Sequence, residues 1–148
     1  MKYFKGNRIL VGKTGQSIHE KEGLIPDITG SCIICPHSFS FLGDIDSNSG
    51  EIMKSDSPGK TLQIAHTIFA FHSSKGSSSG CVILSSLAQR NKGPLAIITL
   101  HAPDYNLVEG AILGGIPFVS EIDPQFFQDM QTGMVVTIRR NKCFVTQN

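Results

Sequence analysis

The 148-residue sequence has no tryptophan, no long apolar run and no strong excess of one charge. Lys and Arg number 13 against 12 Asp and Glu, so the charge predicts neither a basic face for a nucleic-acid backbone nor a polybasic segment for a membrane surface. No apolar run approaches the ~20 residues of a membrane-spanning helix. Both a nucleic-acid partner and a membrane partner are therefore unexpected.

The first eight residues lack the apolar core and the small-residue cleavage site of a signal peptide. We therefore expect a cytoplasmic protein. A chain of this length can bury one proper hydrophobic core but is too short for two well-formed ones. The expectation is a single domain that spans residues 1–148.

The four cysteines are expected to be buried thiols rather than disulfides in a cytosolic chain. Cys32 and Cys35 form a C-x-x-C, but they lie in a predicted strand, where residues three apart point to opposite faces. No second Cys or His pair follows at zinc-like spacing. We therefore expect no metal site on this chain.

Two other motifs fail on spacing. A phosphate-binding P-loop needs four residues between its glycines, whereas five separate Gly6 from Gly12. A calcium loop that began at Asp44 would need a glycine and an acid where Ser49 and Ser55 stand. Neither site is expected.

Hydrophobic periodicity and turn residues predict an α/β domain with a largely buried sheet. A helix should follow the serine cluster and end near Gln89, with Gly93 as its cap, and a second helix should occupy residues 105–113. Residues 15–30 read as an irregular connection and residues 124–127 as an aromatic turn. Strands are expected at residues 2–12, 31–35, 61–72, 94–100 and 116–119, and a hairpin at 134–146.

A serine- and glycine-rich turn lies between the apolar run that ends at Phe71 and the first predicted helix. Turns between regular elements often carry active-site residues. The free N–H groups and the positive dipole end of a helix that begins here would favour an anion. Local sequence alone, however, favours a simpler interpretation in which the serines cap the helix.

Four segments in the same order resemble the small, swivel-type unit of the aconitase X family. They are Ser40-Phe41-Leu42-Gly43-Asp44-Ile45-Asp46 with Ser49-Gly50-Glu51-Ile52, Lys75-Gly76-Ser77-Ser78-Ser79-Gly80, Gly93-Pro94-Leu95-Ala96-Ile97-Ile98, and the stretch from Gly110-Ala111 to Gly115-Ile116-Pro117-Phe118-Val119. The resemblance covers roughly residues 1–146. It implies a swivelling β/β/α domain like the aconitase swivel domain, and a large partner subunit that carries an iron-sulfur cluster or iron, with no cofactor on this chain.

The resemblance further implies a hydro-lyase in which Ser77, directly after a glycine, is the proton-abstracting base. A serine hydroxyl can act as a base only if positive charge or N–H donors hold its alkoxide form. Known family activities are dehydration of mevalonate 5-phosphate in archaeal isoprenoid synthesis, the expected reaction, and of cis-3-hydroxy-L-proline in bacteria. A non-catalytic module that binds an anion or a partner is the alternative. The residues expected to bind substrate are Lys75, Gly76, Ser78, Ser79, Gly43 and Asp44.

Asp44 departs from the family pattern, because members usually carry a second glycine there, and this leaves the identity of the substrate open. Each histidine taken singly reads as solvated or as a satisfied core residue, and His72, nearest the serine cluster, is the one to test. The other histidines interpreted in this way are His37, His66 and His101. Four phenylalanines read either as a partner-binding patch or as core: Phe39, Phe41, Phe126 and Phe127.

Overall fold

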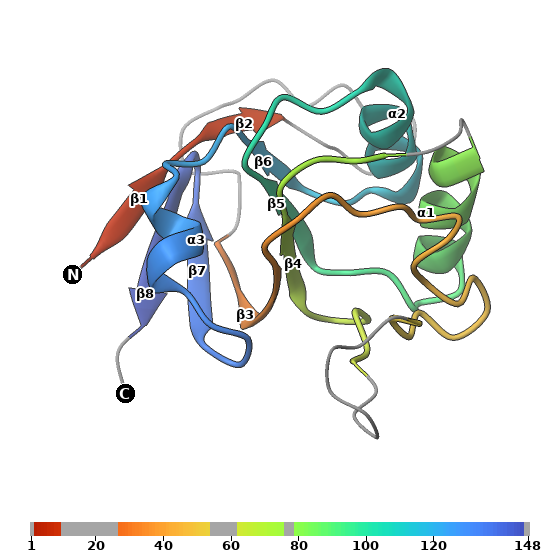
Figure 1. The fold of residues 1–148 in the computed structure, drawn as a ribbon, viewed down its shortest axis with the longest axis horizontal. Helices are drawn as coiled ribbons and strands as arrows, with labels where there is room; N and C mark the ends of the chain where they lie inside the picture. Colours follow the sequence, from red (N-terminus) through yellow and green to blue (C-terminus); the bar gives the residue numbers. More distant parts are fainter. Residues whose placement is uncertain (1, 10–26, 54–61, 76–78, 147–148) are drawn as a thin grey trace.

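The computed structural model describes residues 2–9, 27–53, 62–75 and 79–146, which form one mixed sheet with helices (Figure 1). The order of strands across the sheet is β1-β8-β7-β3-β4-β5-β6-β2. None of the helices in these ranges is long and apolar enough to cross a membrane. The elements are β1 (Tyr3–Lys5), β2 (Asn7–Ile9), β3 (Ile28–Cys35), β4 (Ile68–Phe71), α1 (Ser79–Gln89), β5 (Ala96–Thr99), α2 (Tyr105–Gly114), β6 (Phe118–Ser120), α3 (Gln125–Asp129), β7 (Val135–Arg139) and β8 (Lys142–Thr146).

The centre of the sheet is parallel. Strands β3, β4, β5 and β6 pair in parallel in that order, and every residue of β4, β5 and β6 is buried. Continuous burial of this kind requires cover on both faces. Helices α1 and α2 supply it on one face, and α3 lies with β1, β7 and β8 on the other (Figure 1).

The N-terminal segment closes the sheet on itself. β1 pairs with β8 at one edge and β2 pairs with β6 at the other, although only Gly6 separates β1 from β2. A Cβ at Gly6 would lie 2.6 Å from Val119 Cγ1 and 2.8 Å from the Ser120 carbonyl oxygen. The chain can therefore pass from one edge to the other only with glycine at this position.

Two hydrophobic cores result. One lies between the parallel strands and α1 and α2, and includes Phe69, Phe71 and Leu84. The other lies under α3 and the antiparallel strands, and includes Ile68 and Phe126. Alternate residues of β4 thus serve opposite cores, as the period of two in a strand requires. The expected β/β/α layering is confirmed.

Most predicted elements are confirmed, with corrections at their boundaries. β3 begins at Ile28, inside the stretch interpreted as irregular, because residues 28–31 pair with β7, a strand more than 100 residues later. β4 begins only at Ile68. The aromatic turn continues into the short helix α3. The expected strand residues 10–12, most of the 15–30 connection and residue 61 lie outside the described ranges.

The C-terminal end of α1 also differs from expectation. Asn91, with φ +59°, takes the left-handed conformation that was expected of Gly93. Glycine is needed at position 93 for another reason: there is little room for a side chain, since a Cβ there would lie 3.1 Å from the Ala88 Cα atom. Asparagine is the non-glycine residue that best tolerates this conformation. Asn91 can therefore end the helix where Gly93 was expected to do so.

The alternative of an exposed aromatic patch is wrong for three of the four phenylalanines. Phe39, Phe41 and Phe126 are no more than 3% exposed and belong to the two cores. Phe127 is partly buried and packs against the second core. Aromatic rings in contact with one another explain the burial, as in the edge-to-face pair of Phe39 and Phe69 at 4.8 Å.

Gly110 allows α1 and α2 to pack closely. A Cβ at this position would lie 2.9 Å from the Cys81 Cα atom and 3.0 Å from its carbonyl oxygen. In an unpacked helix, Gly→Ala stabilises by ~1 kcal/mol. Here we expect Gly110→Ala to lower the free energy of unfolding by about 1–3 kcal/mol, as overpacking does, in a urea titration.

Gly80→Ala is the matched control in α1. A Cβ at Gly80 would meet only the Phe41 Cβ, at an ordinary 3.8 Å. This variant should keep or slightly raise the free energy of unfolding. Equal effects of the two substitutions would contradict the role given to Gly110.

Candidate functional site

The site is built on an extension of the β3–β4 pair beyond the sheet. Residues 37–40 run beside residues 72–75 in the same direction. The Phe39 N–H donates to the Ser73 carbonyl oxygen at 2.9 Å, and the Lys75 N–H donates to the Phe39 carbonyl oxygen at 3.0 Å. With its side chain buried among aromatic rings, Phe39 fixes the register that brings Lys75 beside Ser40.

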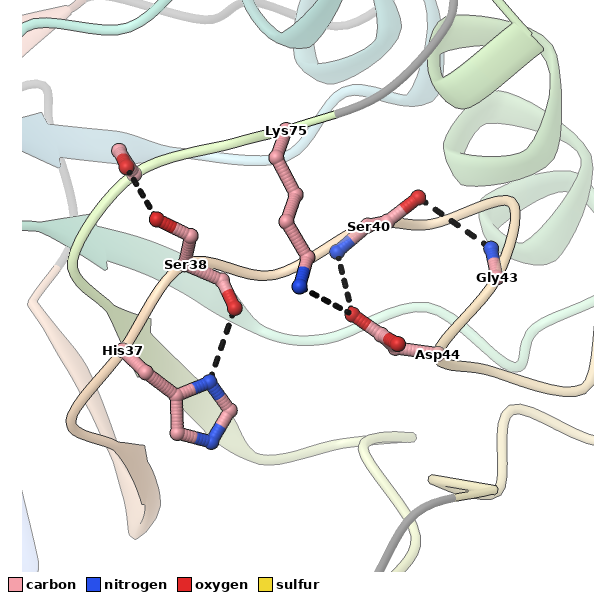
Figure 2. Close-up of polar contacts among 7 residues, drawn as sticks. His37, Ser38, Ser40, Gly43, Asp44 and Lys75 are labelled. Carbon is pink, nitrogen blue, oxygen red and sulfur yellow. Dashed lines mark hydrogen bonds and ion pairs between the residues drawn. The ribbon is translucent and has the colours of Figure 1, made fainter.

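Asp44 holds the loop that follows. The Ser40 N–H donates to Asp44 Oδ2 at 2.9 Å, and the Asp44 N–H donates to the Ser40 carbonyl oxygen at 2.9 Å. The Gly43 N–H donates to Ser40 Oγ at 3.2 Å. Lys75 Nζ lies 3.9 Å from the same Asp44 oxygen, so the carboxylate stands between the loop backbone and the lysine (Figure 2). Asp44 is only 8% exposed.

A hollow lies between this loop and the N-terminal ends of two helices. Gly80, in the first turn of α1, lines it, as does Leu107 in the first turn of α2. Asp104 caps α2 by accepting the Leu107 N–H at 2.9 Å. Both helix dipoles present their positive ends here, next to Lys75, and the carboxylates of Asp44 and Asp104 lie at the same place. The lining residues are Ser40, Phe41, Ser74, Lys75, Gly80, Asp104, Asn106 and Leu107.

The structure brings several predicted site residues together. Lys75, Gly43 and Asp44 lie around Ser40, and α1 begins at Ser79 as the capping pattern suggested. Gly76, Ser77 and Ser78 lie outside the described residues. Described residues on both sides of that turn, Lys75 and Gly80, line the same hollow.

Of the eight lining residues only Lys75 was predicted from sequence as a site residue, and four polar ones were not: Ser40, Ser74, Asp104 and Asn106. Asp104 carried a usable signal, because an aspartate directly before an apolar-periodic segment is a preferred N-cap. Ser40 and Asn106 carried none, since their place depends on how the loop and α2 meet α1. Only the tertiary structure supplies that contact.

The described residues do not offer a metal site. No group of three His, Cys, Asp or Glu side chains within them could hold a metal ion. Cys32 and Cys35 lie in opposite cores, and burial raises the pKa of the Cys32 thiol to about 12. A thiol that keeps its proton is a poor ligand for iron, so this pair does not fit an iron centre.

Asp44 should contribute to stability through its bond to the Ser40 N–H. We expect Asp44→Ala to lower the free energy of unfolding by about 1.5–3 kcal/mol, the range for a buried hydrogen bond to a charged group. Asp44→Asn should cost less, because an amide oxygen can still accept from Ser40. Chemical denaturation of both variants tests this. An equal loss in both would mean that the charge, and not the acceptor, matters.

Comparisons with known proteins bear on this site. A family model described as aconitase X swivel domain matches residues 17–146. The phosphomevalonate dehydratase small subunit of Pyrococcus horikoshii is 36% identical over 111 residues, 75% of this chain and 80% of that protein. The subunit of the same name from Archaeoglobus fulgidus is 33% identical over 116 residues, 78% of this chain and 86% of that protein.

A solved structure agrees with the sequence comparisons. The crystal structure of Thermococcus kodakaraensis aconitase X in its holo-form superposes with a TM-score of 0.77 and 27% identity, and the match covers 99% of this chain and 100% of that chain. Fold and sequence point the same way. This chain belongs to the aconitase X swivel-domain family.

Proposed function

We propose that this chain is the small subunit of a hydro-lyase that dehydrates mevalonate 5-phosphate, and that it is active only with a large subunit. The support is the name shared by relatives that are 29–36% identical over most of their length, phosphomevalonate dehydratase small subunit. The same name implies a large partner. The hollow beside Lys75 would be the part of the active site that this chain contributes.

The observation that carries the proposal is the hollow beside Lys75, which is lined by described residues on both sides of positions 76–78. Lys75 precedes the turn, α1 begins just after it, and the N-terminal end of α2 faces the same hollow. A serine base needs such surroundings, because they favour the alkoxide over the neutral hydroxyl. We therefore assign Ser77 as the proton-abstracting base and Lys75 as a binding group for the anionic substrate.

Asp44 is assigned a positioning role rather than contact with substrate. Its carboxylate accepts the Ser40 N–H. The residues that line the hollow include Ser40 and Lys75 but not Asp44 itself. The glycine usual in the family at this place would not offer this acceptor to the Ser40 N–H. A buried acid that holds the loop does not repel the substrate as an exposed one would, since Lys75 offsets its charge at 3.9 Å.

The iron-sulfur cluster or iron expected from the family would belong to the large subunit, since the described residues of this chain do not fit it. There an iron centre would polarise the leaving hydroxyl as a Lewis acid. This chain would bind and orient the substrate, exclude water from above and take the proton at Ser77 Oγ.

Co-expression with the large subunit tests the proposal. The purified complex should convert mevalonate 5-phosphate to its anhydro product, whereas this chain alone should be folded and inactive. cis-3-Hydroxy-L-proline is the comparison substrate. Turnover of hydroxyproline alone would refute the assigned substrate but not the reaction. Absence of any turnover, with tight anion binding by the isolated chain, would favour a non-catalytic binding module.

A further inference from the structure

Three histidines form a row across the carboxyl ends of neighbouring parallel strands. His37 follows β3, His72 follows β4 and His101 follows β5. The backbone N–H of His72 donates to the His37 carbonyl oxygen at 3.0 Å. The backbone N–H of His101 donates to the His72 carbonyl oxygen at 2.9 Å. Because hydrogen-bonded strands lie ~4.8 Å apart, the backbone holds these three residues, the histidine row, side by side.

The imidazole rings remain available to a ligand. His37 and His101 are exposed, and only His72 is partly buried, where its ring meets Phe127 of α3 edge-to-face at 4.8 Å. The His72 and His101 ring centroids are 6.3 Å apart. His37 Nδ1 lies 2.8 Å from the Ser38 carbonyl oxygen. Since a carbonyl oxygen can only accept, Nδ1 of His37 is the protonated ring nitrogen. Nε2 is then the nitrogen that can take up a second proton.

The histidine row is separate from the hollow. His37 lies apart from the Lys75–Asp44 pair (Figure 2), and His72 packs towards α3 rather than towards α1 and α2. None of the described histidines lines the hollow. A function of the row is therefore not part of the role assigned to Lys75 and Ser77.

The surroundings of His72 disfavour its protonated form in the absence of a ligand. Burial, then the neighbouring His101 and His37 imidazoles, hold the pKa of His72 below its usual range. The side chain that faces His72 from α3 is Phe127, which carries no charge. An anion among the rings would offset both the burial and the mutual repulsion. Metal coordination is not indicated, because the described residues contain no group of three ligands that could hold an ion.

We propose that His37, His72 and His101 bind a phosphate group, either of inorganic phosphate or of a phosphomonoester. Rings from three adjacent strands can each donate one N–H to a tetrahedral oxyanion, and charge-assisted bonds of this kind are the strong ones. The edge outside the carboxyl ends of parallel strands is also the usual ligand site of open α/β sheets. Binding takes up protons, so affinity should increase as the pH falls from 8 towards 6.

NMR of the histidine ring protons of the full chain tests the site, with inorganic phosphate as the first probe. The three ring signals should shift saturably with one common Kd, and the pKa of His72 should rise when phosphate is present. Sulfate, whose charge does not change in this range, should bind about tenfold more tightly at pH 6 than at pH 8. The double variant His37→Gln/His101→Gln should lose about tenfold or more in affinity for phosphate.

His66→Asn is the matched control. His66 lies before β4, at the opposite end of that strand, and has φ +61°, which asparagine tolerates. This variant should bind phosphate as the parent does. The proposal is overturned if the shifts do not saturate, if the double variant binds equally well, or if Zn²⁺ binds the row and displaces phosphate.

Two further probes distinguish the source of the phosphate group. Tighter binding of mevalonate 5-phosphate than of inorganic phosphate, with none of mevalonate, would identify a phosphorylated acid as the ligand. Equal affinities would identify free phosphate. Equal binding of mevalonate and its phosphate would refute a phosphate site. None of these measurements uses turnover, so their failure would leave the proposed dehydration untouched.

Discussion

Ser77→Ala should lower kcat of the assembled complex by about 10²–10⁴-fold, the loss that follows removal of a general base. KM should change little, because Lys75, which lines the hollow, would still bind the substrate. An interaction made only in the transition state appears in kcat and kcat/KM together. Steady-state kinetics with mevalonate 5-phosphate measure this directly.

Ser78→Ala is the matched control, since it removes the same hydroxyl one residue later. A capping or backbone role for Ser78 predicts less than tenfold loss of kcat and at most ~1 kcal/mol of stability. Size-exclusion chromatography should show that both variants still assemble with the large subunit. Full turnover by Ser77→Ala in an assembled complex would show that the base is another group.

Lys75→Gln separates binding from proton abstraction. The lysine head is largely exposed and lies beside a carboxylate, so its loss should leave the fold intact. If Lys75 binds the anionic substrate, KM should rise about tenfold with a smaller change in kcat. A loss confined to kcat would instead make Lys75 a partner in holding the Ser77 alkoxide.

Local signals explain why α1 and α2 could be predicted from sequence, whereas α3 was interpreted as a turn. Asp104 before α2 and Gly115 after it are a capping residue and a left-handed stop, and the structure has both. The apolar spacing from Val82 to Ala88 depends on neighbours within one or two turns. Such signals come from residues close together in the sequence, so they can be recognised without the tertiary structure.

Long-range pairing explains what could not be predicted. Ile28–Gly30 form a strand only because β7 lies beside them. Glycine is required at position 6 only because a Cβ there would lie 2.6 Å from Val119 Cγ1 of β6. The histidine row is a further case, since His37, His72 and His101 are far apart in sequence and become neighbours through the order of β3, β4 and β5. Taken singly, each was interpreted as an ordinary histidine.

The candidate site, like the fold, could be predicted from the sequence only in part. The resemblance to aconitase X pointed to Gly43, Asp44 and Lys75, and these lie together around Ser40. The sequence did not show that Asp44 faces the loop backbone. Its orientation depends on the ladder between residues 37–40 and 72–75, which forms only when β3 and β4 are in register.

Phe39→Ala should therefore damage both the core and the site. Phe39 is 1% exposed, and its ring lies 5.2 Å from Phe41, 4.8 Å from Phe69 and 5.7 Å from Phe71. Truncation of a buried phenylalanine costs about 3–5 kcal/mol of unfolding free energy. Against the 5–15 kcal/mol that a domain of this size has in total, the loss should be visible as a large fall in the urea midpoint.

Phe39→Leu distinguishes loss of volume from loss of the site. Leucine keeps most of the volume, so its cost should stay near 1–1.5 kcal/mol. The Lys75 N–H, which donates to the Phe39 carbonyl oxygen, reports on the ladder by hydrogen exchange. In Phe39→Ala this amide should exchange faster than the overall loss of stability requires, because the ring anchors the strand extension that carries Lys75. If its protection falls only in step with global stability, Phe39 supports the core alone and the ladder positions Lys75 without it.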